Sequence, residues 1–115
     1  MNSFEYYNPV RIIFHRNSLN NISRLIDGRR ALLLTSRGFT DRGIVDKVKQ
    51  MTNDIRFVID TVPPNPTFND LAVLYNDVNH DEIDVIVALG GGSVIDSAKV
   101  LSVYHSNKSF TLVKE

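Results

Sequence analysis

The strongest candidate for chemistry in this sequence is a run of three glycines followed by serine, residues 90–93. The run lies between an apolar stretch, residues 85–89, and a segment whose apolar residues recur at helical spacing. Glycines at such a point allow positive φ angles and remove the Cβ atoms that would keep a ligand away from the backbone. N–H groups at the start of the following helix favour an anion, and Ser93 adds a hydroxyl donor. The run therefore predicts a phosphate-binding site.

A purely structural interpretation of the same residues stays open, namely a turn followed by a helix cap. Ser93-x-x-Asp96 resembles a capping box, although Glu or Gln is more usual at the second position. The run is neither the G-x-G-x-x-G fingerprint of the Rossmann fold nor a P-loop, because it lacks the G-K-[ST] ending.

Two further segments follow predicted strands and would reach the same edge of a parallel sheet. The first is Ser36-Arg37-Gly38, where no acid is available to accept hydrogen bonds from ribose hydroxyls. Ser36 and Arg37 suit a 2′-phosphate instead, which a carboxylate would repel. The alternative is that Arg37 is simply an exposed loop residue.

The second segment holds Asn65 between Pro64 and Pro66. The two prolines restrict the backbone, so Asn65 is expected to be held rigidly and to bond a ribose or an amide of a ligand. The alternative is a strand exit that leads into a helix capped by Thr67.

No catalytic or metal-binding set stands out among the remaining residues. The histidines, His15, His80 and His105, lack the close spacing of paired metal ligands, and the 115-residue chain has no cysteine. A net charge of zero argues against a nucleic-acid binder, and no apolar run is long enough to span a membrane. The N-terminus lacks a signal-peptide pattern, so we expect a cytoplasmic protein.

The charges are unevenly distributed. Up to Arg56 the chain has ten basic and five acidic residues, and from Phe57 onward it has three basic and eight acidic ones. A basic first half could help to attract an anionic ligand, but scattered surface charge gives the same count.

The elements that position these residues alternate regularly, which predicts a doubly wound, mostly parallel α/β sheet in a single domain. Strands are predicted over residues 10–14, 31–35, 55–62 and 85–89. Helices are predicted to begin at Ser18, at Thr40 or Asp41, at Thr67 and after Ser93. Their inward faces are predicted to hold Leu19, Ile22, Leu25 and Ile26; Ile44, Val45, Val48 and Met51; Phe68, Leu71, Leu74, Tyr75 and Val78; and Val94, Ile95, Ala98 and Leu101.

Residues 90–99, GGGSVIDSAK, resemble the GGGSxxDxAK signature of the iron-containing (group III) alcohol dehydrogenases. Residues 64–67, PNPT, match a segment of that family at a fitting distance, and residues 8–14, NPVRIIF, resemble its start. The related glycerol dehydrogenase and dehydroquinate synthase groups have similar glycine loops. The resemblance covers about Phe4 to Tyr104 and implies a Rossmann-like, dehydroquinate synthase-like N-terminal domain.

The resemblance further implies a metal-dependent, NAD(P)-linked enzyme that interconverts alcohols and aldehydes or ketones. Gly91, Gly92 and Ser93 match positions that hold the pyrophosphate of the dinucleotide. Asp96 matches the acid of the motif near the nicotinamide, and Asn65 matches a position near the nicotinamide ribose. Many NAD-preferring members have Asp where this chain has Ser36, so NADP is the expected cofactor, with NAD as the alternative.

Family members continue with a TTAGTGSE-like stretch and a helical domain, which supplies one Asp and three His to Fe²⁺ or Zn²⁺. The chain ends at Glu115, before these features. We therefore expect residues 1–115 to be the NAD(P)-binding domain only, to bind no metal and to have no turnover alone. The alcohol or aldehyde would be bound through the other domain, and a homodimer is a further expectation. The competing hypothesis is a non-catalytic module that binds a nucleotide or phosphate.

Overall fold

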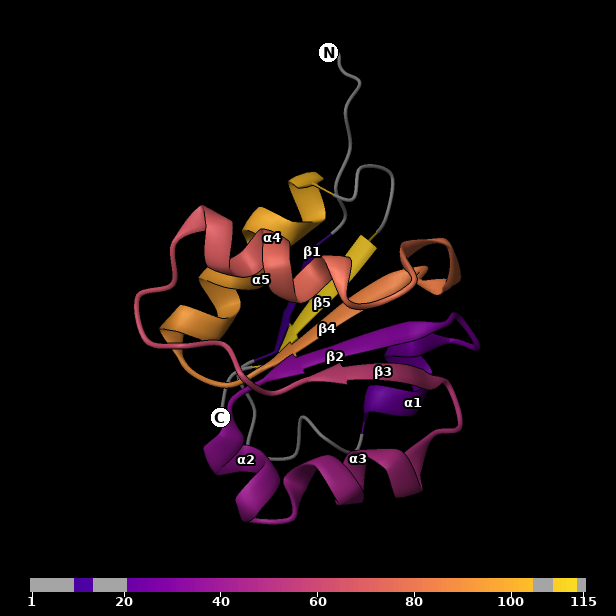
Figure 1. Ribbon diagram of the computed structural model, residues 1–115. Coiled ribbons are helices and arrows are strands. Elements are labelled where there is room, and N and C mark those ends of the chain that lie inside the picture. The colour runs from indigo at the N-terminus through magenta and orange to yellow at the C-terminus, as the bar shows by residue number, and fades with distance from the viewer. Residues whose placement is uncertain (1–9, 14–20, 105–108, 114–115) are drawn as a thin grey trace.

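A five-stranded parallel sheet forms the centre of the computed structural model, which describes residues 10–13, 21–104 and 109–113. The strand order is β1-β5-β4-β2-β3 (Figure 1). The strands are β1 (Val10–Ile13), β2 (Ala31–Thr35), β3 (Ile55–Ile59), β4 (Val85–Leu89) and β5 (Ser109–Val113). Every neighbouring pair is parallel. Because the strands all run one way, their carboxyl ends meet at one edge of the sheet.

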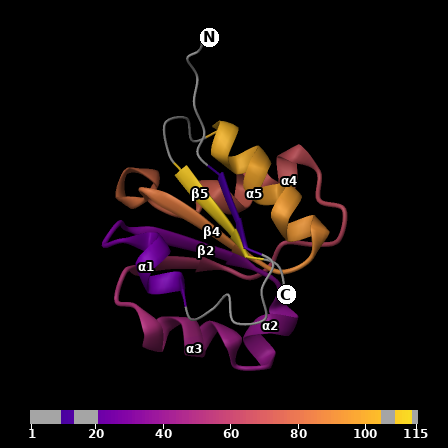
Figure 2. The same cartoon turned by 180° about the vertical axis from the view of Figure 1, so that it is seen from behind.

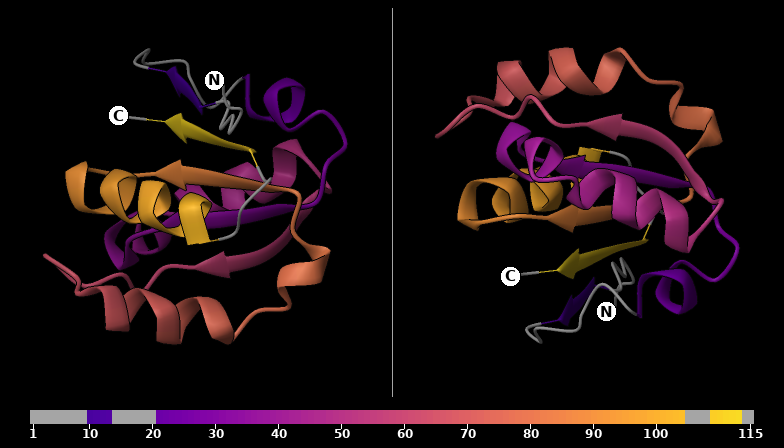
Figure 3. Two further views of the ribbon diagram at one scale, coloured as in Figure 1. Left: turned by 90° about the horizontal axis from the view of Figure 1, so that it is seen from above. Right: turned by 90° about the horizontal axis from the view of Figure 1, so that it is seen from below.

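Helices cover both faces of this sheet. The helices are α1 (Ile22–Ile26), α2 (Arg37–Asp41), α3 (Ile44–Met51), α4 (Phe68–Asn76) and α5 (Gly92–Tyr104), with a short 3₁₀ helix, η2 (His80–Glu82). The first three lie on one face, and α4 and α5 lie on the other (Figures 1 and 2). Seen from above, α5 lies along β4, and seen from below, α2 and α3 lie across the strands (Figure 3). The predicted doubly wound α/β fold is therefore confirmed.

Two apolar clusters hold the layers together, and alternate residues of β2 and β4 belong to different clusters. On β2, Leu32 and Leu34 pack with α4 and α5, whereas Ala31 and Leu33 pack with α1 and α3. All five residues of each strand are buried. Strands covered on both faces need continuous apolar sequence, which is what residues 31–35 and 85–89 have.

The sequence predicted β2 and β4 with the observed bounds, but several other predictions need correction. The third strand ends at Ile59 and not at Val62, since residues 60–62 leave the sheet. The second helix was predicted to begin at Thr40 or Asp41, but α2 already begins at Arg37 and ends at Asp41, and α3 begins separately at Ile44. The final strand, β5, was not predicted at all.

The predicted inward helix faces hold with one exception. Phe68 is 61% exposed, because it is the first residue of α4 and lies beyond the edge of the core. The predicted cap at Ser18, Leu19 of the first helix and the end of the first strand at Phe14 lie outside the described residues.

The start of α4 shows why the helix begins where the sequence predicted. The Thr67 hydroxyl accepts a hydrogen bond from the Asp70 N–H at 3.0 Å, and the Asp70 carboxylate accepts one from the Thr67 N–H at 2.9 Å. This capping box satisfies two N–H groups that have no partner within the helix. It also fixes the direction in which the chain leaves the proline segment.

At the amino edge of the sheet, Arg30 and Asp84 join β2 to β4. The Arg30 guanidinium donates to both carboxylate oxygens of Asp84, at 2.8 and 2.9 Å, and the Arg30 N–H donates to the same carboxylate at 3.0 Å. The hydrogen bonds with Asp84 raise the pKa of Arg30 above its ordinary value.

None of the helices formed by the described residues has the length and the apolar character that a membrane span requires.

Candidate functional site

The carboxyl ends of β2 and β4 form the place where the chain changes direction across the sheet. From β2 the chain passes through α2 and α3 to the outer strand β3, whereas from β4 it passes through α5 to β5 on the other side. The two connections diverge and leave a crevice between them, which is where ligands bind in open α/β sheets. The buried Thr35 hydroxyl donates to the Leu89 carbonyl at 2.6 Å and ties these two strand ends together.

The glycine run leads from β4 into α5, and its members have different roles. Gly90 is buried, with φ +157°, and a Cβ there would lie 3.0 Å from Cγ2 of Val94. A Cβ on Gly91 or Gly92 would meet no atom of the described residues within 4 Å, apart from the adjoining backbone, and neither has a positive φ. The predicted positive φ is thus confined to Gly90. The fold itself does not require glycine at the other two positions.

Helix α5 begins at Gly92, and the N–H of Ile95 donates to the Gly91 carbonyl at 3.1 Å. Gly91 is therefore the residue that precedes the helix, and Ser93 lies inside its first turn. The capping-box interpretation of Ser93 and Asp96 is wrong for this reason. The first N–H groups of α5 have no partner within the helix and are available to a ligand.

A hollow of about 340 Å³ lies beside the glycine run. It is lined by Ser36, Val62, Pro63, Pro64, Gly91, Gly92, Ser93 and Val94. Four predicted site residues, from two segments more than fifty positions apart, therefore meet around one space. The sequence analysis missed Val62 because it assigned this residue to the third strand.

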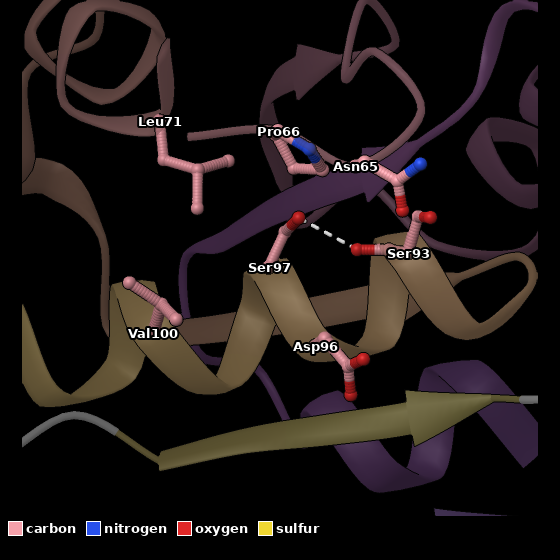
Figure 4. A pocket seen from close by; sticks show the side chains of 7 residues that line it. All are labelled: Asn65, Pro66, Leu71, Ser93, Asp96, Ser97 and Val100. Atoms are coloured by element: carbon pink, nitrogen blue, oxygen red, sulfur yellow. Dashed lines mark hydrogen bonds between the residues drawn. The ribbon is translucent and has the colours of Figure 1, made fainter. Parts of the chain in front are cut away.

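A second hollow of about 190 Å³ shares Ser93 with the first and lies between the proline segment and α5. Its lining includes Asn65 and Asp96, the two remaining predicted residues on this side of the sheet. Figure 4 shows the Asn65 and Ser93 side chains next to each other, with the Asp96 carboxylate pointing away from them. The Ser97 hydroxyl donates to the Ser93 carbonyl at 2.6 Å (Figure 4).

Asn65 has φ +48°, a left-handed conformation that asparagine tolerates better than most residues. This conformation turns the backbone between Pro64 and Pro66. Asn65 lines the second hollow together with Ser93 of the glycine run, and its rigid placement stays a prediction.

Arg37 does not line either hollow, unlike the other predicted residues. Its side chain is 63% exposed, and its Nε lies 3.5 Å from Oδ2 of Asp60, the residue that follows β3. The same carboxylate oxygen accepts a hydrogen bond from the Thr40 hydroxyl at 2.7 Å. Sequence patterns do not reveal this contact of Asp60, because the pairing of β2 with β3 cannot be derived from them.

Part of the basic first half of the chain faces away from the hollows. Arg30 precedes β2 and is bonded to Asp84, so both lie at the amino edge of the sheet. Arg29 donates to the carbonyls of Leu25 and Ile26 at the end of α1. These arginines stabilise the opposite edge and contribute little to the potential at the glycine run.

Within residues 10–13, 21–104 and 109–113, no three His, Cys, Asp or Glu side chains are grouped so that they could hold a metal ion. His80 begins η2, whereas His15 and His105 lie outside the described residues. The described residues therefore do not fit a metal centre.

The chain is similar in sequence to known dehydrogenases. Residues 9–115 match the family described as iron-containing alcohol dehydrogenase. The chain is 30% identical to NADH-dependent butanol dehydrogenase A of Clostridium acetobutylicum over 100% of its own length and 32% of that protein. It is 31% identical to NADP-dependent alcohol dehydrogenase 3 of Entamoeba histolytica over 90% of its length and 28% of that protein.

The fold is similar to that of an iron-containing alcohol dehydrogenase from Thermococcus thioreducens, with a TM-score of 0.72 and 29% sequence identity. The superposition covers 87% of this chain and 28% of the Thermococcus chain. The chain thus spans about a third of the length of the relatives that it matches.

Proposed function

This chain belongs to the iron-containing alcohol dehydrogenase family, and we propose that it is the dinucleotide-binding part of an NAD(P)-linked enzyme that interconverts alcohols with aldehydes or ketones. One observation carries the proposal. Gly91 and Gly92 line a hollow at the crevice between β2 and β4, and among the described residues nothing occupies the space that their missing side chains leave. Such a space suits a group that must approach the backbone closely, as a pyrophosphate does.

The residues around the hollow fit a dinucleotide in chemical type. The N–H groups at the start of α5 and the Ser93 hydroxyl would hold the pyrophosphate. Ser36 would face the adenosine ribose, because it follows β2 and lines the same hollow. Asn65 and Asp96 in the adjoining hollow would face the nicotinamide end, as the family resemblance implies.

The bound nicotinamide would supply the hydride acceptor or donor, and the residues of this chain would bind and orient it. Since the described residues do not fit a metal centre, we propose that Fe²⁺ or Zn²⁺ and the alcohol are held by another part of the full-length enzyme. The 115-residue chain alone is then expected to bind the cofactor without turnover. Reduction of butanal by the purified chain with NADPH and added Fe²⁺ would contradict this.

Titration of the purified chain with NADPH and NADH, followed by nucleotide fluorescence, tests the binding proposal directly. Saturable binding that inorganic pyrophosphate displaces is the expected result. A chain that binds inorganic phosphate but neither dinucleotide would support the non-catalytic phosphate-binding module instead.

We further propose a preference for NADPH, because Ser36 leaves room for a 2′-phosphate and Arg37 provides a nearby positive charge. The names of the relatives include both an NADH-dependent and an NADP-dependent enzyme. Replacing Arg37 by Ala should reduce the difference between the binding free energies of NADPH and NADH by about 1.5 kcal/mol, which is roughly tenfold in affinity. This is the lower end for a charge-assisted contact, because Arg37 is exposed. A clear preference of the unaltered chain for NADH would reject this part.

A homodimer and a cytoplasmic location remain predictions from the sequence. Sedimentation of the purified chain with and without NADPH would test the first of these. Fractionation of the source cells, with the protein detected by antibody, would test the second.

A further inference from the structure

We propose that Asp60 is a specificity-determining residue, which weakens the selection of a 2′-phosphate by neutralising the charge of Arg37. The inference rests on the proposed dinucleotide function. It concerns a residue that neither the glycine run nor the family signature includes.

The placement of Asp60 follows from the sheet. Leu34 of β2 pairs with Ile59 of β3, so Asp60, which follows β3, lies next to Thr35, the last residue of β2. Ser36 and Arg37 come next on the β2 side. Asp60 therefore lies at the carboxyl edge of the sheet, beside the strand after which the chain lacks an acid.

The contacts of Asp60 fix its carboxylate against Arg37. Oδ2 accepts a hydrogen bond from the Thr40 hydroxyl at 2.7 Å and lies 3.5 Å from Nε of Arg37. The Asp60 side chain is only 22% exposed, whereas that of Arg37 is 63% exposed. The carboxylate is thus held by α2 while the guanidinium still faces solvent.

The effect of Asp60 on a phosphate bound to Arg37 depends on the distance between the carboxylate and that phosphate. Arg37 meets Asp60 through Nε and leaves the outer edge of the guanidinium for an incoming phosphate. A phosphate bound at that edge would lie roughly 6–8 Å from the carboxylate, which is within the screening length at physiological salt. The negative charge of Asp60 then repels the 2′-phosphate and offsets part of the attraction by Arg37. A ligand with a free 2′-hydroxyl is not repelled in this way.

The decisive experiment compares two ligands that differ only in this phosphate, 2′,5′-ADP and 5′-AMP, by calorimetric titration of the 115-residue chain. The test variant is Asp60→Asn, whose amide oxygen can still accept the Thr40 hydrogen bond. We expect it to bind 2′,5′-ADP about three- to tenfold more tightly, with 5′-AMP affinity unchanged. Asp81→Asn is the matched control, because it removes the same charge from an exposed residue of η2 at the amino edge.

A double-mutant cycle separates this effect from a general structural one. In an Arg37→Ala background, Asp60→Asn should no longer favour 2′,5′-ADP to the same extent, because the repulsion acts together with the Arg37 contact. If Asp60→Asn lowers the melting temperature strongly, Asp60→Ser provides the same charge change with a smaller side chain.

The inference alone would be overturned if Asp60→Asn and Asp60→Ser bind 2′,5′-ADP no more tightly than the unaltered chain does while they still bind 5′-AMP. Loss of binding of both ligands by the unaltered chain would overturn the proposed function, and the inference with it. The two failures are distinguished by whether 5′-AMP binds.

Discussion

Alanine at Gly90 and alanine at Gly92 are expected to have opposite effects, which separates folding from ligand binding. A Cβ at Gly90 would lie 3.0 Å from Cγ2 and 3.1 Å from Cβ of Val94, in a backbone conformation with φ +157°. Val94 is buried beneath the start of α5 and belongs to the apolar cluster on that face. It cannot move without disturbing its neighbours.

The loss of stability expected for Gly90→Ala has two contributions, backbone strain at residue 90 and overpacking against Val94. Backbone strain and overpacking each cost on the order of 1–3 kcal/mol, and we expect a total near 2–3 kcal/mol because one shift of α5 relieves part of both. For a domain of this size, that corresponds to a fall in melting temperature of roughly 8–12 °C.

Gly92→Ala should leave the fold intact. A Cβ there meets no atom of the described part of the chain within 4 Å beyond the adjoining backbone, and the residue begins a helix, where Ala is favoured over Gly by up to about 1 kcal/mol. The melting temperature should therefore stay the same or rise. The methyl group would nevertheless occupy space that a pyrophosphate needs, so NADPH affinity should fall at least tenfold, about 1.4 kcal/mol.

The assay is thermal unfolding by circular dichroism together with NADPH titration of each variant. If Gly92→Ala binds NADPH as tightly as the unaltered chain, the hollow beside the glycine run is not the cofactor site. If Gly90→Ala melts at the unaltered temperature, the contact with Val94 does not constrain the loop as described.

Three further changes test the supports of the site by urea unfolding. Thr67→Ala removes one half of the capping box and should cost about 1 kcal/mol, whereas Asn69→Ala on the same helix should cost almost nothing. Thr35→Val keeps the shape but removes the buried bond to the Leu89 carbonyl, and should cost about 1–2 kcal/mol; an unchanged urea midpoint would contradict that role. Asp84→Ala leaves the Arg30 N–H without its carboxylate and should lower the urea midpoint; a loss that disappears in 1 M salt would show that only the surface charge matters.

Most of the fold follows from local pattern, and the exceptions have physical causes. Residues 31–35 and 85–89 are short, apolar except for Thr35, and bounded by polar or glycine residues, so their strands could be delimited by sequence. The third strand ended three residues earlier than predicted, because the β-branched Thr61 and Val62 favour a strand beyond the point where pairing with β2 stops. Residues 109–113 have strand-like composition, but their pairing with β1 and β4 depends on distant parts of the chain.

The site could be predicted to a similar degree. The glycine run, Ser36 and Asn65 were identified because they follow strands, and the sheet brings them to one crevice. Which glycine the fold requires was not predictable, since it depends on the position of Val94. The role of Asp60 also escaped sequence reasoning, because its partner Arg37 lies on another strand's exit and only the order β2-β3 makes them neighbours.

The position of β5 between β1 and β4 has a consequence for how the chain folds during synthesis. Val10 pairs with Phe110, and Val85 pairs with Ser109, so the inner edge of β4 stays open until the last described strand has left the ribosome. Until then β4, with the sequence VIVAL, exposes unpaired backbone groups of the kind that lead to aggregation. The early strand β1 must likewise wait for a partner about a hundred positions later. Nascent chains halted before Ser109 should therefore depend on chaperones far more than chains that include Val113.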